Sequence, residues 1–519
     1  MKNHQKQSAA IIAFFCFFSM IIPLVAFAEE STGDIATMRK EIDALRKECQ
    51  QSKELNSKLE TRLEQLEQKM NSLQSQPARI TPVASTEQRI ASKEEKRGVV
   101  TSLTHDDLAR LTKGFEFGGY FRSGAGGNSR GGKMEAFQAP DAPAKYRLGN
   151  EQETYLEAIF SEKDWNPDPD GVKIYTQMRF SYKTQQNQSE DTGISNTVPP
   201  SSISAVKADK VLLRELYAQM GNFIPNDPEA KVWAGERFYR LPELDINDFW
   251  WSDMSGYGGG FEDLKFFDIG RLNIAYIGFA SNDLDLKTNH GRFYKNNLHF
   301  MLKEVKVPAG KGTFWINGGY MAGGSYAGTK YPNLGGVDLG LMHSAGKEKV
   351  NNQFSMQFGY GVNSTLSSSA NIAPSHNDKN AWTFRTTDML NYKFNEKVSV
   401  QLVDVFQYAD SGRSTQAKTL WASVGMRPVV GLSKYLALEI EPGVDYVNEP
   451  LKGYADYLFK FTTALRLAPG GQFDAHPRFR LFATYAKWGS DFKDQGVGGS
   501  GYNGQSYGTN IGIQCEHWW

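Results

Sequence analysis

From residue 114 to the end of the chain, apolar and polar residues alternate along short segments with a period of two. In FEFGGYFRSG, residues 115–124, every phenylalanine takes an odd position, whereas Tyr120 and Arg122 take even ones. In KYRLGNEQETYLEAIF, residues 145–160, all the charged residues and Tyr155 fall on odd positions. A helix would spread these positions around its circumference, whereas a strand places them on one face. The pattern predicts strands with one apolar face and one charged face.

We count about eighteen such segments between 114 and 519, which predicts an all-β, 18-stranded antiparallel transmembrane β-barrel. A soluble β-sandwich would also alternate, but its apolar face would point into a core, and the face that carries Arg and Glu here has nothing dry to pack on. In a barrel the polar face lines the lumen and the apolar face meets lipid. Short connections such as PNDPEA, DIG, NEK and GLSK take turns with long polar loops. The long loops, expected outside the cell, are 127–144, 187–210, 241–256, 284–295, 364–380 and 491–506.

A heptad pattern runs from Ile35 to Leu73, with mostly Ile, Leu and Met at the two core positions. It predicts a periplasmic α-helical coiled coil over residues 29–76, in which the heptads from Ile35 to Leu73 span roughly 58 Å at 1.5 Å per residue. The less apolar centre, Cys49, Ser52 and Asn56, is typical of positions that fix register. A lone amphipathic helix is the alternative. Residues 77–113 are polar, begin with Pro77 and are expected to be a linker ahead of the 114–519 barrel domain.

The first 28 residues have the features of an export signal. Lys2 and Lys6 precede the apolar run AAIIAFFCFFSMIIPLVAFA, which ends in the small-x-small cleavage pattern at Ala26 and Ala28. An uncleaved membrane anchor is the alternative. No other apolar run reaches 18 residues, so no further helical span is expected. We therefore expect an exported chain that is integral to the bacterial outer membrane.

Composition narrows the classes of function further. Lysine plus arginine equals aspartate plus glutamate, at 58 each, which argues against a nucleic-acid binder. Three cysteines cannot supply a disulfide framework, whereas 50 glycines, 32 phenylalanines and 23 tyrosines suit a barrel with tight turns and aromatic girdles. The eight histidines show no catalytic or metal-ligand spacing. We expect no enzyme activity, no cofactor and no metal.

Several stretches resemble the maltoporin-like sugar porins of bacterial outer membranes. They are FEFGGYFRSG, KYRLGNEQETYLEAIF, VWAGERFYR followed by DFWWSDMSG, VGMRP, RFRLFATYAKW and the terminal HWW, spread over roughly 114–519. A coiled coil ahead of the barrel resembles the sucrose-porin branch. The resemblance implies a homotrimer of 18-stranded barrels in outer-membrane lipid, which conducts sugars by facilitated passive diffusion.

The resemblance also implies a lane of aromatic residues, the greasy slide, with polar groups beside it. Flat sugar faces lie on aromatic rings while hydroxyl groups bond to charged side chains. Carried over by position, the slide residues are Tyr120, Tyr155, Trp421 and Trp518. The polar track residues are Arg122, Arg147, Glu157, Arg214, Asp248 and Asp253. Trp250 stands at the constriction, where the family has a tyrosine.

The chain departs from maltoporin at several positions, so the sugar it takes cannot be transferred. The polar TQQNQSEDTG replaces a slide tryptophan, Leu241 replaces a track arginine, and 127–155 lacks the cysteines of a loop disulfide. Trp421 and Trp518 could instead be girdle residues, and the arginines could be paired wall charges. A general or anion-preferring porin is the main alternative function, although inward acids such as Glu157 and Glu516 count against a phosphate filter. An adhesin or a hydrolase fits the sequence less well.

Overall fold

The structure is a computed structural model. It describes residues 114–165, 171–185, 210–280, 293–326, 329–368, 379–413, 418–470 and 472–519. The predicted signal peptide, coiled coil and linker lie outside these residues and stay predictions. No helix among the described residues is long and apolar enough to cross a membrane.

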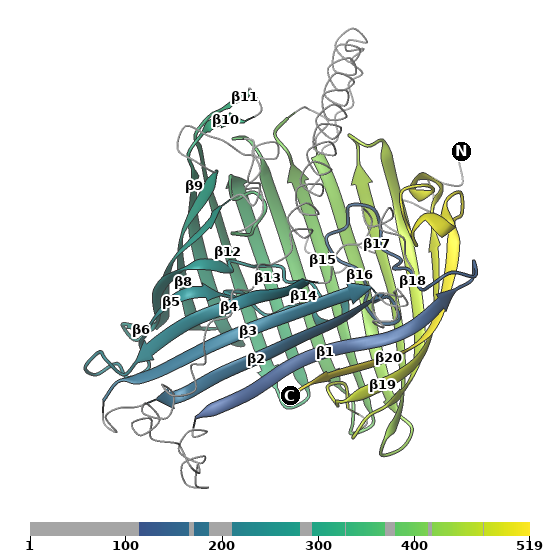
Figure 1. The fold of residues 1–519 in the computed structure, drawn as a ribbon, viewed down its shortest axis with the longest axis horizontal. Helices are drawn as coiled ribbons and strands as arrows, with labels where there is room; N and C mark the ends of the chain where they lie inside the picture. The colour runs from purple at the N-terminus through teal and green to yellow at the C-terminus, as the bar shows by residue number, and fades with distance from the viewer. Residues whose placement is uncertain are drawn as a thin grey trace, which may run out of the picture. The chain divides into compact units, whose positions relative to one another are not determined.

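An antiparallel sheet of 18 strands closes on itself (Figure 1), which confirms the predicted barrel. One half consists of β1 (Phe115–Asn128), β2 (Glu153–Trp165), β3 (Lys173–Gln185), β4 (Lys210–Gly221), β5 (Lys231–Arg237), β6 (Gly256–Phe266), β7 (Gly270–Ala280), β8 (Tyr294–Val307) and β9 (Gly310–Met321). The other half consists of β12 (Leu334–Lys347), β13 (Val350–Gly361), β14 (Trp382–Lys393), β15 (Val398–Asp410), β16 (Lys418–Gly431), β17 (Leu436–Glu449), β18 (Tyr454–Leu467), β19 (Arg478–Trp488) and β20 (Tyr507–Trp518). The first and last strands pair and close the barrel, with Tyr120 opposite Trp518.

Smaller elements lie in the connections between the barrel strands. They are the hairpin of β10 (Gly324–Tyr326) and β11 (Thr329–Tyr331) and the 3-10 helices η4 (Asp245–Asn247), η6 (Ser490–Phe492) and η7 (Ser500–Tyr502). Connections at one end are mostly longer than those at the other, as the sequence predicts. Two differ: 450–453 is short at the long-loop end, and 468–477 is long at the short-turn end.

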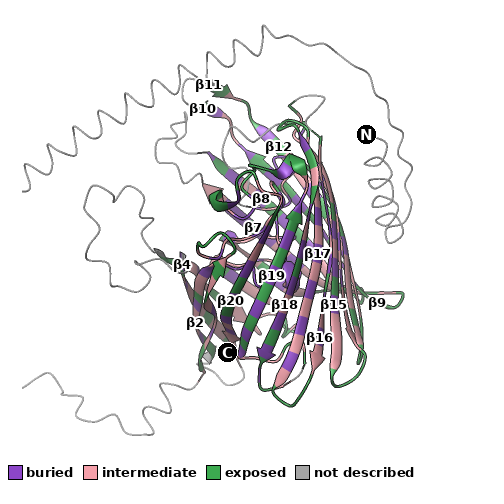
Figure 2. Ribbon diagram, turned by 90° about the vertical axis from the view of Figure 1, so that its right-hand side faces the viewer, coloured by how far each residue is buried: buried purple, intermediate pink, exposed green. Residues whose placement is uncertain are grey.

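Burial alternates along each strand with the predicted period of two. On β19, Arg478 and Arg480 are buried inside the barrel, whereas Phe479 and Leu481 are more than half exposed on its outer face. Figure 2 shows this alternation as purple and green bands along β19 and β20. The pleat of the strands thus separates a charged inner face from an apolar outer face that suits lipid.

The register is interrupted at a few places, one of which lies at the candidate site. Between β3 and β4, Arg179 pairs with Glu215 but the next residue, Phe180, pairs with Leu213. Arg214 is therefore the extra residue of a β-bulge. A bulge locally breaks the two-residue alternation and re-aims the side chains around it. Parity alone consequently cannot assign the face of Arg214.

The largest buried apolar cluster lies where two long loops fold back into the barrel. Tyr146 belongs to the loop 129–152, and Phe249 and Trp251 belong to the loop 238–255; all three are buried together with Trp421 on β16. A backbone hydrogen bond of 3.0 Å from Arg147 N to Ile246 O joins the two loops. The core of this molecule is thus a packed contact between loops and wall, and it narrows the lumen.

Candidate functional site: the constricted lumen

The loop 238–255 is held across the lumen by polar contacts to the opposite wall. Ile246 N donates to Gln401 Oε1 on β15 at 3.1 Å, and Arg385 Nη1 on β14 donates to Trp251 O at 2.6 Å. The loop 129–152 is held in the same way, because Leu148 N donates to Glu441 Oε1 on β17 at 3.0 Å. These bonds satisfy backbone groups that would otherwise be buried without partners.

Three of the predicted residues, Tyr120, Arg122 and Arg147, meet where the loop 129–152 crosses β1 and β20. Arg147 Nη2 donates to Tyr120 Oη at 2.7 Å and to Glu516 Oε1 at 2.8 Å, and Tyr120 Oη donates to the same carboxylate at 2.9 Å. Arg122 Nη2 lies 2.5 Å from Glu153 Oε1. Guanidinium groups and carboxylates therefore alternate around the tyrosine hydroxyl. Such charge-assisted bonds are the strong ones in a partly dry site.

Tyr155 continues this arrangement on β2. Its ring centroid is 6.1 Å from that of Tyr120, and the two planes are inclined by 53°. Its hydroxyl donates to Glu157 Oε1 at 2.5 Å, while Glu157 Oε2 lies 2.5 Å from Arg179 Nη1 on β3. The Arg122 guanidinium lies 5.0 Å from the Tyr155 centroid. These contacts thus form one continuous patch of Tyr120, Tyr155, Arg122, Arg147 and Glu157.

Trp518 lies beside this patch, but its ring is in contact with other residues. It is the direct neighbour of Tyr120 across the β1–β20 pair. The His476 ring stacks on it at 4.0 Å, and the Arg478 guanidinium lies 4.5 Å from its centroid. His476 belongs to the connection 468–477, the long member of the short-turn end. A solute that reaches Trp518 must therefore share its ring with these two groups.

Trp421 is placed apart from the other predicted slide residues. Only 3% of its surface is exposed, because the Phe249 ring packs edge-on against it at 5.3 Å. Its indole N–H donates to Asp445 Oδ1 at 3.0 Å. In this position Trp421 anchors the loop 238–255, and its predicted contact with a sugar stays a prediction.

The remaining predicted residues lie along the loop 238–255 and β4. Asp248 Oδ2 is 3.7 Å from Arg122 Nη1, so the loop and the β1 wall are in electrostatic contact. Asp253 Oδ1 accepts a hydrogen bond from Ser255 N at 2.9 Å, which fixes the return of the loop towards β6. Trp250 is 37% exposed, and Arg214 lies 5.3 Å from the Phe238 centroid.

Burial perturbs one acid of this loop. It raises the pKa of the Glu243 carboxyl to about 8; Arg147 opposes the shift, whereas the neighbouring Asp248 and Asp245 carboxylates add to it. Below about pH 8 the carboxyl is therefore neutral, and above that pH the constriction carries one more negative charge.

Much of the remaining lumenal charge is paired within the wall. On β16 to β19, Arg427 and Lys460 bind Glu441, while Arg466 and Arg480 bind Glu439, all within 3.0 Å. These residues stabilise one another and leave few donors for a solute. No group of three or more His, Cys, Asp or Glu side chains that could hold a metal ion occurs among the described residues.

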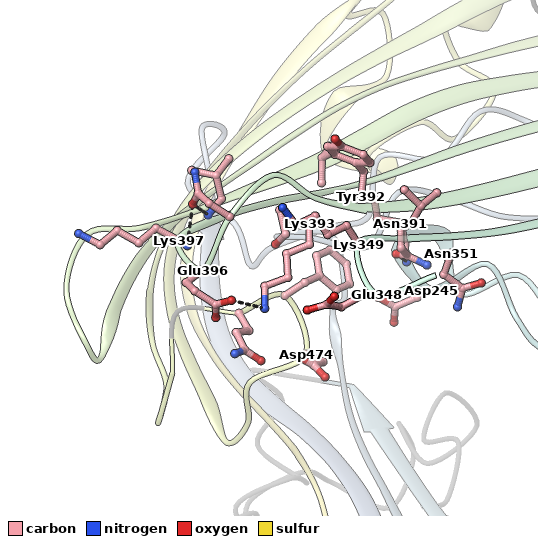
Figure 3. A pocket seen from close by; sticks show the side chains of 18 of the residues that line it. Asp245, Glu348, Lys349, Asn351, Asn391, Tyr392, Lys393, Glu396, Lys397 and Asp474 are labelled. Atoms are coloured by element: carbon pink, nitrogen blue, oxygen red, sulfur yellow. Dashed lines mark hydrogen bonds and ion pairs between the residues drawn. The ribbon is translucent and has the colours of Figure 1, made fainter. Parts of the chain in front are cut away.

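A cavity of about 500 Å³ opens at the short-turn end, below the inserted loops. Figure 3 shows its lining: Lys349 and Glu348 from one turn, Lys393 and Glu396 from another, and Asp245 from the loop 238–255. Lys393 Nζ and Glu396 Oε1 are 2.9 Å apart. Trp518, Arg478 and Phe473 complete the wall, so the cavity reaches the predicted slide residue Trp518.

Three residues that line the constricted lumen were not among the predicted site residues. Arg179 could have been found, because it shares the inward parity of Gln177 and Ser181 on β3. Arg240 and His476 lie in connections without periodicity, so no local signal places them inside the lumen. Only the way the loops fold back reveals them.

A closed antiparallel barrel with a charged lumen and an apolar outer face defines the class of outer-membrane β-barrel channels. A family model described as LamB porin matches residues 115–519. The chain therefore belongs to the LamB porin family, which is a family of diffusion channels in the outer membrane.

Several solved porin structures are similar to this chain at low sequence identity. OccAB4 of Acinetobacter baumannii is 10% identical, with 78% of this chain and 98% of that chain covered at a TM-score of 0.42. OpdK of Pseudomonas aeruginosa, solved with vanillate, is 10% identical. The match covers 78% of this chain and 99% of that chain, with a TM-score of 0.43. The trimer form of OmpT of Vibrio cholerae is 9% identical. The match covers 78% of this chain and 99% of that chain, with a TM-score of 0.35. These likenesses are too distant to inform the residues of this lumen.

Proposed function

We propose that this channel conducts sugars selectively by facilitated passive diffusion. The observation that carries the proposal is the patch in which the Tyr120 and Tyr155 rings, 6.1 Å apart, lie among Arg122, Arg147 and Glu157. A sugar ring has flat C–H faces and a rim of hydroxyl groups. Aromatic rings bind the faces, and charged side chains exchange hydrogen bonds with the rim.

The charges of the patch are already paired, which suits a channel better than a tight receptor. A passing sugar exchanges one set of hydrogen bonds for another, so neither entry nor release costs much free energy. Passage needs sites that bind well enough to attract the solute and weakly enough to release it. Trp518 and the cavity beside it would take the sugar next, on its way to the periplasm. No step in this process breaks a covalent bond.

The main alternative is a general or anion-preferring diffusion porin without sugar selectivity. The paired wall charges would then only solvate the lumen. Carboxylates at Glu157, Asp248 and Glu516 disfavour a filter that concentrates inorganic anions along the whole lumen, because such a filter needs an excess of inward cations. The aromatic patch has no role in a general pore, and this favours the sugar channel.

We also propose that the protein is a homotrimer in outer-membrane lipid. The support is membership of the LamB porin family together with the heptads of residues 35–73, which would hold a periplasmic coiled coil. The mass of the protein in detergent solution tests this assembly.

Replacing Tyr155 by alanine tests the sugar channel. In planar bilayers, sugars should block the ion current of the wild-type channel, and Tyr155→Ala should weaken that block about fivefold, because one stacking face worth on the order of 1 kcal/mol is lost. The conductance to small ions should stay similar or rise. Tyr435→Ala, in an exposed turn, is the matched control. If no disaccharide blocks the wild-type current at roughly tens of millimolar, the protein is a general porin.

A further inference from the structure

The guanidinium of Arg240 lies between two aromatic rings of the loop 238–255. Its Cζ is 3.7 Å from the centroid of the Phe238 ring and 4.0 Å from that of the Trp250 ring. The backbone of Arg240 pairs with that of Asp253, and this pairing folds the loop so that Trp250 returns towards Arg240. Stacking of this kind uses the faces of the guanidinium and leaves its N–H donors available at the edge.

Those edge donors are unoccupied by any described residue. No described carboxylate lies within ion-pair distance of Arg240, and none does so for Arg214, whose Nε is buried without a partner. Both guanidinium groups lie over the same Phe238 ring, at 3.7 and 5.3 Å. Arg179, 5.1 Å from that ring, is different, because it binds both Glu157 and Glu215 at 2.5 Å.

Three acids near this pair of arginines are engaged elsewhere. Glu157 and Glu215 are held by Arg179, and Asp253 accepts a hydrogen bond from Ser255 N instead of binding Arg240. Two guanidinium groups without a described acidic partner thus lie over the Phe238 ring, and one of them contacts Trp250, which is 37% exposed. An oxyanion fits such a place, and a planar carboxylate matches the fork of a guanidinium with two parallel hydrogen bonds.

We propose that the constriction selects sugars that carry a carboxylate, such as a uronic acid unit. Trp250 stacks on the sugar ring, while Arg240 and Arg214 bind the carboxylate beside it. This inference rests on the proposed sugar channel and narrows its substrate class. The next residue, Leu241, is buried in the apolar cluster that contains Phe249 and Trp251. The cationic group at this level of the pore is therefore Arg240, held rigid by its two rings.

The test compares two disaccharides of matched size as blockers of single-channel current, cellobiouronic acid and neutral cellobiose. At fixed ionic strength, the wild-type channel should bind the uronic acid about tenfold more tightly than cellobiose, because a bidentate charged contact is added. Arg240→Gln should reduce this ratio to about one. Arg240→Lys keeps the charge but loses the fork, so its ratio should fall between the two. Arg130→Gln, which removes an exposed arginine of the first loop, should leave the ratio unchanged.

The outcomes separate this inference from the proposed function. Block by cellobiose that is as strong as block by the uronic acid overturns the inference and leaves the sugar channel standing. A ratio that persists in Arg240→Gln overturns the role of Arg240. Glucose 6-phosphate that blocks more strongly than glucuronate overturns the carboxylate assignment. Failure of every sugar to block overturns the sugar channel and this inference with it.

Discussion

At the scale of single residues, alternation is informative only where the strand is regular. Tyr120, Arg122, Tyr155 and Glu157 share a predicted lumenal face, and the structure brings them into one patch. Trp421 has the same inward parity, yet Phe249 covers it. Parity specifies which side of the wall a residue occupies. It does not specify whether a loop lies on top of that residue.

Titration of the Glu243 carboxyl should make the ion selectivity of the channel depend on pH. Because burial raises its pKa to about 8, raising the pH from 6 to 9 should add one negative charge to the constriction, near Asp245, Asp248 and Arg147. Cation selectivity, read from the reversal potential in a salt gradient, should therefore increase over that range. Glu243→Gln should remove the increase while the selectivity at pH 6 stays close to that of the wild type. An equal increase in both proteins would assign the titration to another group.

Only part of the candidate site could be predicted from the sequence. The wall residues were found because every second position of a strand faces the lumen. Arg240 and His476 were not found, because their positions depend on loops that fold back, and no local period records that. Arg214 was assigned by resemblance alone, since the bulge at this point interrupts the period. Long-range packing therefore sets the constriction, while local pattern sets the wall.

At the scale of elements, the loop 129–152 is held by a slot in the wall. The Tyr146 ring is 1% exposed and lies on Gly425 and Gly443, which are opposite each other on β16 and β17. A Cβ atom at either glycine would lie 2.2 Å from a ring carbon of Tyr146. The Tyr146 hydroxyl is hydrogen-bonded to Ser423 Oγ at 2.9 Å. The absence of side chains at these two strand glycines thus leaves the space that the Tyr146 ring fills.

Filling that slot should release the loop. Gly443→Ala forces a methyl group into the Tyr146 ring, so we expect the loop 129–152 to leave its position at a cost on the order of 2 kcal/mol from overpacking. Single-channel conductance should rise and become noisier. Gly318→Ala is the matched control, because a Cβ there meets nothing within 4 Å. Unchanged conductance in Gly443→Ala, with the protein still inserted, would show that this loop does not limit the current.

At the scale of the whole molecule, the barrel was the most predictable part. Eighteen strands were expected, and eighteen form the closed sheet, because the period-two pattern and the alternation of loop lengths both follow from membrane geometry. The short connection 450–453 and the long connection 468–477 break the expected asymmetry. The long one carries His476 to Trp518, so this departure from the simple barrel lies at the site itself.

Removal of residues 29–76 separates the roles of the two regions. The wall of the pore begins after Gly114, so the truncated protein should keep its single-channel conductance and its sugar block. If the heptads of 35–73 support the trimer, the truncated oligomer should dissociate at a lower temperature than the full-length oligomer when samples are heated before gel electrophoresis. An equal dissociation temperature would leave trimer stability to the barrels alone. Loss of all conductance, with the truncated protein still inserted, would show that the N-terminal region takes part in forming the pore.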